Sequence, residues 1–260
     1  MPLDIAGIEL KLDRAAQHLD ALERSLDTFM GDDPNRRRGI AIEVDTERRQ
    51  WRIVIHLPDN LPPEWGVLIG EVLYHLRSSL DHIVNGLVES PTRSNEFPIY
   101  ARPSDYRSNE ERLLAGVASE HRTTIYDLQP FRLNEDCPTE TTIWSLHELA
   151  RLDRHRFLHF AELYLLDLPI VFNPAGGAVI DWMVEMPCRI EHDAVVARGR
   201  YADASMYPDV EVNAFATADM VLSDLKALRI ENPTEAGILA IDGLKFMLNH
   251  VRLDVLPRFS

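Results

Sequence analysis

The sequence predicts an α+β protein, in which a helical bundle carries an inserted antiparallel β-meander and a small β-hairpin. Two long segments, 5–29 and 69–87, repeat apolar residues at spacings of three and four, as helices buried along one side do. After residue 157, short alternating runs separated by turns are typical of sequential antiparallel strands. We expect a single domain across 1–260, with the bundle in 1–30, 62–156 and 232–256, the hairpin in 39–56 and the sheet in 157–217.

The first helical segment has the clearest apolar seam. Its members are Ile5, Ile8, Leu12, Ala15, Leu19, Leu22, Leu26 and Phe29. Such a seam needs an apolar partner, and the stripe in 69–87 has the matching periodicity. We therefore predict that these two helices pair. Between them, Ile40–Val44 and Trp51–Ile55 alternate around a charged turn, which predicts the hairpin.

The remaining helices and strands are predicted from the same two patterns, the spacing of three and four for helices and the alternation for strands. Further helices are expected at Ser104–Ala118, Glu120–Leu128, Thr141–Arg154 and from Asn232 onward, where a proline follows a capping residue. Strands are expected at Phe157–Leu166, Ile170–Phe172, Val179–Met186, Ala194–Tyr201 and Val210–Ala216.

Composition limits the classes of function. The net charge of −15 opposes non-specific binding to nucleic acid, although a local basic groove is still compatible with it. No apolar run is long enough to cross a bilayer and no signal peptide is visible, so we expect a cytoplasmic protein without a membrane partner. Cys137 and Cys188 could form one long-range disulfide, but two reduced thiols are the simpler reading. A glycine-rich phosphate loop is missing, and we expect no cofactor.

Candidate chemistry coincides with a clear helix at Arg77-Ser78-Ser79-Leu80-Asp81-His82. This insert resembles the Arg-x4–6-His signature of HEPN domains, helical bundles that often act as metal-independent ribonucleases. The resemblance implies that His82 transfers protons, that Arg77 holds the scissile phosphate of RNA, and that two protomers form the site. An imidazole with a pKa near neutrality and a planar guanidinium suit these two roles.

Helix geometry favours a structural alternative for the same residues. Five residues along a helix is a rotation of about 500°, so Arg77 and His82 would point roughly 140° apart. Arg77 and Asp81, four residues apart, would instead form an ion pair on the helix surface. His75 and His82 share a face but lie roughly 10 Å apart along the axis, too far to ligate one metal ion. We expect no metal site.

A second polar constellation occupies His147–His159. His147-Glu148 begins like a zinc-protease motif, but Arg151 stands where the second histidine must lie. The run Asp153-Arg154-His155-Arg156 falls at a predicted helix C-terminus, where cations are favourable. A structural charge cluster is the simpler interpretation, and an anion site in which Arg154 and Arg156 bind phosphate is the alternative.

A longer resemblance covers most of the first 160 residues. The matching features are Glu71–His82, Phe97-Pro98-Ile99, Leu128-Gln129-Pro130-Phe131, Leu146-His147-Glu148-Leu149 and Asp153-Arg154-His155-Arg156. They are similar to an uncharacterised bacterial family, for which no activity follows. The resemblance implies that the two polar segments belong together, in a composite site made of Arg77, Asp81, His82, Asp153, His155 and Arg156. Of these, we expect Arg77, Asp81, His82 and His155 to be the catalytic residues.

Two functions from different classes remain. One is a HEPN-like endoribonuclease, or a protein that binds RNA or a phosphorylated ligand, acting as a homo-oligomer. The other is a non-catalytic interaction or scaffold protein whose helices mediate assembly, which the acidic charge and the incomplete catalytic set favour.

Overall fold

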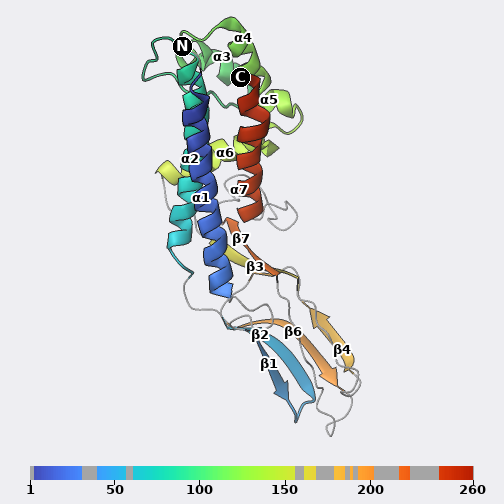
Figure 1. Cartoon of the computed structure of the whole chain (residues 1–260). Coiled ribbons are helices and arrows are strands. Elements are labelled where there is room, and N and C mark those ends of the chain that lie inside the picture. Colours follow the sequence, from blue (N-terminus) through green and yellow to red (C-terminus); the bar gives the residue numbers. More distant parts are fainter. Residues whose placement is uncertain are drawn as a thin grey trace.

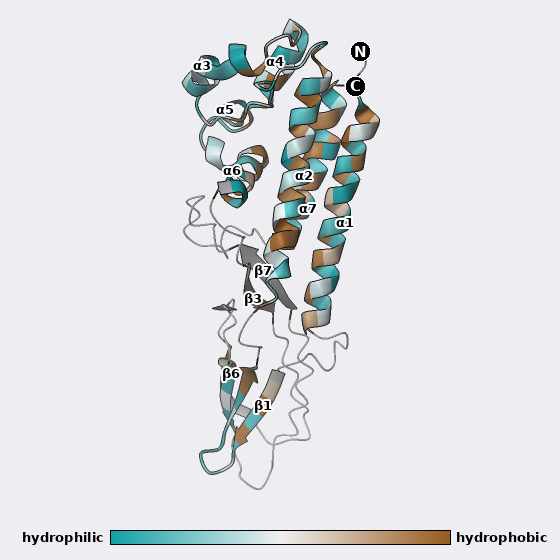
Figure 2. Ribbon diagram, turned by 90° about the vertical axis from the view of Figure 1, so that its left-hand side faces the viewer, coloured by the Kyte–Doolittle hydropathy of each residue, from teal (hydrophilic) through white to brown (hydrophobic). Residues whose placement is uncertain are grey.

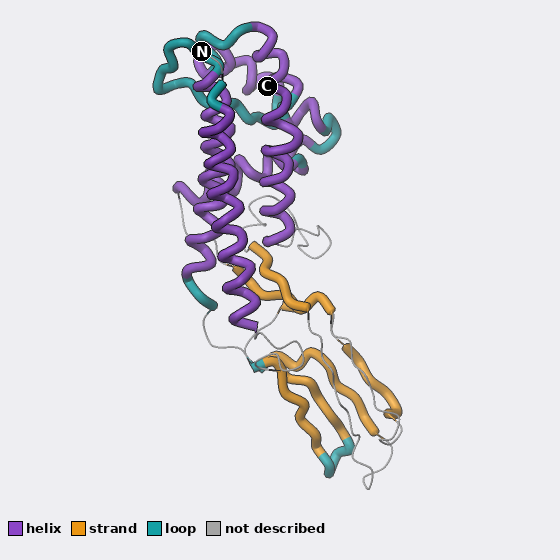
Figure 3. Tube along the Cα trace, viewed as in Figure 1, coloured by secondary structure: helices purple, strands orange, loops and turns teal. Residues whose placement is uncertain are grey.

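The computed structural model places helices at one end of an elongated molecule and strands at the other (Figures 1 and 3). It describes residues 3–30, 40–56, 61–155, 161–167, 179–184, 188–189, 193–201, 217–222 and 240–259. The α+β class predicted from the sequence is confirmed.

The core of the bundle is the pair of long helices α1 (Ile5–Met30) and α2 (Glu64–Gly86), which pack along their length. This pairing was predicted from the matching seams and is confirmed. The indole of Trp65 also donates a hydrogen bond to Ser25 Oγ across the pair, at 2.9 Å. The fully buried seam residues include Ile8, Leu12, Leu19 and Leu22 of α1 and Ile69, Leu73, Leu76, Leu80 and Ile83 of α2.

A third bundle helix, α7 (Ala240–Asn249), lies beside both α1 and α2 (Figure 2). It continues through a π-helical turn, η3 (His250–Val255), and a 3-10 turn, η4 (Leu256–Phe259). Ion pairs fasten it to α1, with Lys245 Nζ 2.7 Å from Glu23 and Arg252 Nη2 2.6 Å from Asp13. The predicted helix start at Asn232 falls outside the described residues.

The shorter helices lie on the side of α2 opposite to α1 (Figure 2). They are α3 (Pro103–Leu113), α4 (Ser119–Asp127), α5 (Pro130–Leu133) and α6 (Thr142–His155), with a 3-10 turn, η1 (Pro138–Glu140), before α6. Of these, α6 packs directly against α2. α4 and α6 lie close to their expected ranges, whereas α3 ends at Leu113 rather than Ala118 and α5 was not predicted. The chain turns at Gly116, whose φ of 83° is left-handed and suits glycine.

The strands in the described ranges form two antiparallel sheets. The larger sheet has the order β1 (Ile40–Asp45), β2 (Gln50–Ile55), β6 (Ala194–Tyr201) and β4 (Val179–Val184); the smaller has the order β5 (Cys188–Arg189), β3 (Ala161–Asp167) and β7 (Thr217–Leu222).

This connectivity differs from a sequential meander with a separate hairpin. The two hairpin strands are confirmed, with Ile42 opposite Ile53, but β2 also pairs with β6 along its other edge. A central place suits β2, because Trp51 and Ile53 are buried on one of its faces. The predicted strands at 170–172 and 210–216 lie outside the described residues, and β5 and β7 were not predicted.

The long helices α1 and α2 both carry charged side chains between their apolar positions. Among the described helices, none combines the length and the apolar content needed to span a bilayer. The hydropathy colouring shows this mixture along α1, α2 and α7 (Figure 2).

Candidate functional site

Arg77 lies on the side of α2 that faces away from α1, and only 6% of it is exposed. Its Nη1 donates to Asp81 Oδ1 at 2.5 Å, and its Nη2 donates to the carbonyl oxygen of Phe97 at 2.9 Å. Asp81 Oδ1 also accepts the backbone N–H of Phe97 at 2.9 Å. Arg77 and Asp81 therefore clamp the extended segment at Phe97 onto α2, and two of the three guanidinium nitrogens are engaged in this clamp.

His82 does not take part in the clamp of Arg77 and Asp81 on Phe97. It is exposed, and partial desolvation, followed by the charge of Lys11 on α1, lowers its pKa. The separation of Arg77 and His82 expected from helix geometry is thus present: one side chain is buried toward Phe97 and the other is exposed near α1. Within one chain, this arrangement does not bring the predicted acid–base group and the predicted phosphate ligand together.

Helix α6 meets α2 at two places. His147 lies close enough to Arg77 for burial, followed by the Arg77 charge, to lower the pKa of its imidazole to about 4. Farther along, the carboxylate of Asp153 lies against Gly70, where an added Cβ would sit 2.5 Å from Oδ1. Gly70 and Arg77 are seven residues apart, or about 10 Å along the helix axis. The end of α6 thus contacts α2, but Asp153 does so about two turns away from Arg77.

The remaining predicted residues are only partly described. Arg154 is exposed, and its Nε donates to the carbonyl oxygen of Ala150 at 3.2 Å. His155 ends α6, but its side chain lies outside the described atoms, as does the whole of Arg156. The composite site that would join Arg77, Asp81 and His82 to His155 therefore stays a prediction.

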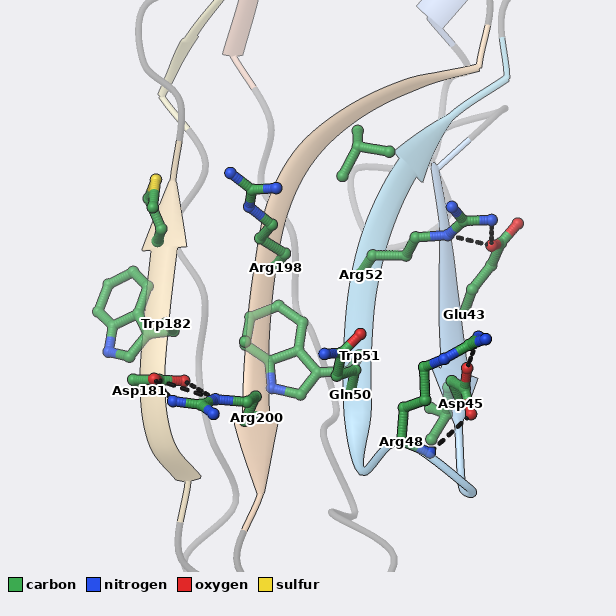
Figure 4. A pocket seen from close by; sticks show the side chains of 14 residues that line it. Glu43, Asp45, Arg48, Gln50, Trp51, Arg52, Asp181, Trp182, Arg198 and Arg200 are labelled. Atoms are coloured by element: carbon green, nitrogen blue, oxygen red, sulfur yellow. Dashed lines mark hydrogen bonds and ion pairs between the residues drawn. The ribbon is translucent and has the colours of Figure 1, made fainter.

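A groove of about 760 Å³ lies instead on the four-stranded sheet (Figure 4). Residues directly opposite each other in antiparallel strands point to the same face. The register therefore builds two rows across the sheet. The first row is Glu43, Arg52, Arg198 and Met183; the second is Asp45, Gln50, Arg200 and Asp181. We call these eight residues the sheet rows.

Cross-strand ion pairs hold the charges of the sheet rows in place. Arg52 Nε donates to Glu43 Oε2 at 2.5 Å, and Arg200 Nη2 donates to Asp181 Oδ2 at 2.6 Å. The hydrogen bond from Arg200 holds the pKa of Asp181 below its usual value. Arg48, in the hairpin turn, pairs with Asp45 at 2.9 Å. Four arginines and three carboxylates thus line the groove, which is nearly balanced in charge.

The outer strand β4 adds large apolar side chains to this groove. Met183 is 53% exposed and lies on the face of the sheet rows, whereas Trp182 is 55% exposed, stands opposite Gly199 and is directed to the other face at the outer edge of the sheet. Both residues line the groove. In Figure 4 the Trp182 ring lies at the edge of the sheet, beside Asp181 and Arg200. Tryptophan, methionine and arginine are the residues enriched at protein interfaces, and exposed aromatic rings also bind unpaired bases.

Comparisons of the chain with protein-family models, with curated proteins and with solved structures find no match. The similarity to HEPN domains and to an uncharacterised bacterial family therefore rests on the motifs alone.

Sequence reasoning missed the sheet rows. The signal lay in three short alternating runs, in which Glu43 and Asp45, Gln50 and Arg52, and Arg198 and Arg200 each flank a single uncharged residue. The pairing of β2 with β6 was the missing information, since without it the arginines of the two strands are not neighbours.

Proposed function

We propose that the chain is a non-catalytic interaction protein that assembles with a second copy of itself through the groove of the four-stranded sheet. The observation that carries this proposal is the composition of the groove, in which ordered charges of both signs lie beside exposed Trp182 and Met183. A two-fold interface brings the same patch of two subunits together, so the patch must complement itself. A face with nearly equal numbers of arginines and carboxylates meets that requirement, because each sign can face the other across the axis.

Trp182 and Met183 supply apolar surface for binding affinity, which the charged side chains alone do not provide. Exposed ion pairs contribute little to affinity, whereas a buried tryptophan commonly dominates an interface. Among the described strands, β4 is also an outer strand of its sheet, and outer strands are the ones that can pair with another chain. The helical bundle then acts as a rigid support for the binding sheet.

The test is the concentration dependence of the oligomeric state, measured by sedimentation velocity on the full chain. We expect a dimer whose dissociation constant rises at least about tenfold in Trp182→Ala and in Met183→Ala, as interface anchors do. Phe246→Ala is the matched control, because Phe246 is 64% exposed on α7, away from the groove. A monomer at all concentrations, or an equal loss in the control, would overturn the proposal.

A second candidate is binding of RNA or another phosphorylated ligand in the same groove. The four arginines favour it, because a guanidinium binds phosphate through two hydrogen bonds. The three carboxylates and the overall charge of −15 oppose it. Fluorescence anisotropy with a single-stranded RNA, at two salt concentrations, decides between them. Salt-dependent binding that Arg200→Gln weakens, in a chain that stays monomeric, would replace the first proposal with this one.

Ribonuclease activity through Arg77 and His82 is the least supported function. The burial of Arg77 means that a phosphate reaches it only if the clamp on Phe97 opens. Cleavage of RNA by the wild type and by His82→Ala, both with EDTA present, tests this reading. Cleavage that is lost only in the variant would restore it, and equal or absent cleavage would remove it.

We also propose that the protein works in the cytoplasm. Cys137 supports this location, because it is an exposed free thiol, and such thiols persist in reducing compartments.

A further inference from the structure

The pairing of α1 with α2 brings together two histidines and a glutamate that are far apart in the sequence. His18 comes from α1, and Glu71 and His75 come from successive turns of α2. One potential ligand atom from each of the three residues lies within 4.8 Å of the other two. Because Glu71 and His75 are four residues apart, they share a helix face, and His75 Nε2 lies 3.8 Å from Glu71 Oε2.

The two imidazoles face each other across the helix pair. Their rings are nearly parallel, at 13°, with centroids 5.6 Å apart. His75 is mostly buried, and its Nδ1 is a buried atom without a hydrogen-bond partner in the described part of the chain. The other ring nitrogen, Nε2, is the one that lies near Glu71, so Nε2 is the atom of His75 that could bind a metal ion together with that carboxylate.

We propose that His18, Glu71 and His75 bind a divalent transition-metal ion such as Zn²⁺. Two imidazole nitrogens and one carboxylate oxygen are a common ligand set for zinc and for other late first-row ions. Facing side chains on neighbouring helices are also the usual way in which bundles build metal sites. The site lies in the bundle, apart from the groove, and does not depend on the proposed self-assembly.

The geometry requires only small adjustments of the side chains. Ligand atoms in a tetrahedral zinc site lie about 3.4 Å apart, as bond lengths near 2.1 Å imply. The distance between Glu71 and His75 is already close to this value. Rotation of the partly exposed His18 ring would supply the third ligand. Glu71 is half-exposed, so at least one coordination position would face solvent and take a water molecule.

Two nearby cations limit the affinity of the site. Lys11 and Arg14 on α1 both act electrostatically on His75, and the Lys11 ammonium lies 5.8 Å from the centre of the Tyr74 ring. Their charges oppose a bound dication, whereas the Glu71 carboxylate favours it. We therefore expect micromolar rather than nanomolar affinity, and we expect it to tighten several-fold in Lys11→Gln.

The experiment is isothermal titration calorimetry, in which Zn²⁺ is added to the full chain after EDTA treatment and dialysis. Visible absorption spectroscopy of the chain loaded with Co²⁺ complements it. One ion should bind per chain, and Co²⁺ should show the intense d–d bands of a site with four or five ligands. Affinity should fall about 100-fold in His75→Ala and His18→Gln and about tenfold in Glu71→Gln, since loss of a ligand costs more than a change of its charge. Mg²⁺, which prefers oxygen ligands, should not bind.

His82→Ala is the matched control, because His82 is an exposed histidine on the same helix, about two turns from His75. It should bind Zn²⁺ as the wild type does. The proposal fails if Zn²⁺ does not bind one-to-one, or if His82→Ala loses as much affinity as His75→Ala. Unfolding of a histidine variant would not hide the answer, because Glu71→Gln and Lys11→Gln change side chains outside the apolar seam and must shift the affinity in opposite directions.

Discussion

The bundle and the four-stranded sheet both contain arginine–carboxylate pairs, but the two regions use them differently. In the bundle, the Arg77 and Asp81 side chains are 7% and 30% exposed, and both also bind the backbone of Phe97. In the sheet, the Arg200 and Asp181 side chains are 59% and 52% exposed. The same chemical pair is therefore part of the fold in one region and an accessible surface in the other.

Solvent explains the difference between the two pairs. A buried pair is desolvated, so removal of one partner leaves the other charged and uncompensated. An exposed pair is screened by water and salt, so each member can exchange its partner for a ligand at little cost. The exposed pairs of the sheet can therefore meet a ligand or partner directly, whereas the buried pair on α2 cannot do so without breaking the fold.

The largest effect is expected where the buried pair is broken. Arg77→Met should reduce the free energy of unfolding by about 3 kcal/mol, because Asp81 and the Phe97 carbonyl lose their donor. Arg200→Met, which removes an arginine from the exposed pair, should change it by less than about 0.5 kcal/mol. Urea unfolding of both variants measures the two values, and similar losses would contradict the contrast between the regions.

Two glycines test how tightly each region is packed. Gly199 on β6 has no room for a Cβ, which would lie 2.6 Å from the Asp181 carbonyl oxygen and 2.6 Å from the Trp51 ring. Gly199→Ala should therefore destabilise the chain by about 2 kcal/mol, since the backbone of a paired strand cannot move aside.

Gly70→Ala is the counterpart in the bundle, because the obstacle at Gly70 is the carboxylate end of the Asp153 side chain. Its cost should be below about 1 kcal/mol, because alanine is also the better helix former. A second change, Asp153→Ser, should remove that cost. Equal losses for the two single variants in urea unfolding would show that the packing does not differ.

His147, on α6 near the buried pair of Arg77 and Asp81, should make the free energy of unfolding fall in acid. Its folded-state pKa of about 4 lies below the unfolded value of about 6.5. As the pH falls from 6.5 toward 4, the unfolded chain takes up a proton that the folded chain does not, so stability is lost over that window. Between pH 7 and pH 5 the loss should be about 2 kcal/mol. His147→Gln should unfold in urea with that much less dependence on pH, and an unchanged dependence would refute the assignment.

The bundle could be predicted from the sequence because the spacing of apolar residues in its helices identifies their buried faces directly. The repeats through Leu12 and Leu19 in α1, and through Leu73 and Leu80 in α2, mark faces that are almost fully buried. Helix geometry alone also separates Arg77 from His82. A periodic pattern of this kind depends only on the local structure of the helix. The buried face can therefore be predicted without knowing which element packs against it.

Contacts between distant segments could not be predicted in the same way. Alternation identifies β2 and β6 as strands, but it carries no information that Arg52 lies opposite Arg198. Similarly, the two helix seams predict a pair but not its axial register, which decides that His18 meets His75. The groove of the sheet and the cluster of His18, Glu71 and His75 both depend on the register between distant segments. Neither could therefore be predicted from the sequence.

A small effect on stability, with a clear effect on assembly, is expected for Arg52 in the sheet rows. Arg52→Glu places two carboxylates opposite each other on β1 and β2, since Arg52 pairs with Glu43. Both side chains are well exposed, so the loss of stability should stay near 0.5 kcal/mol, as for a cross-strand pair of like charges. If the groove joins two copies, the same change should weaken dimerisation about tenfold by unbalancing a self-complementary surface.

Arg24→Glu changes the net charge by the same amount on the exposed side of α1, where Arg24 Nε donates to the carbonyl oxygen of Asp20. Sedimentation of the two variants at equal salt therefore separates a specific contact from a general effect of charge. If Arg24→Glu weakens the dimer as much as Arg52→Glu does, assembly depends on net repulsion rather than on the groove. If only Arg52→Glu does so, the exposed ion pairs of the sheet have a role in recognition that the buried pair of the bundle does not.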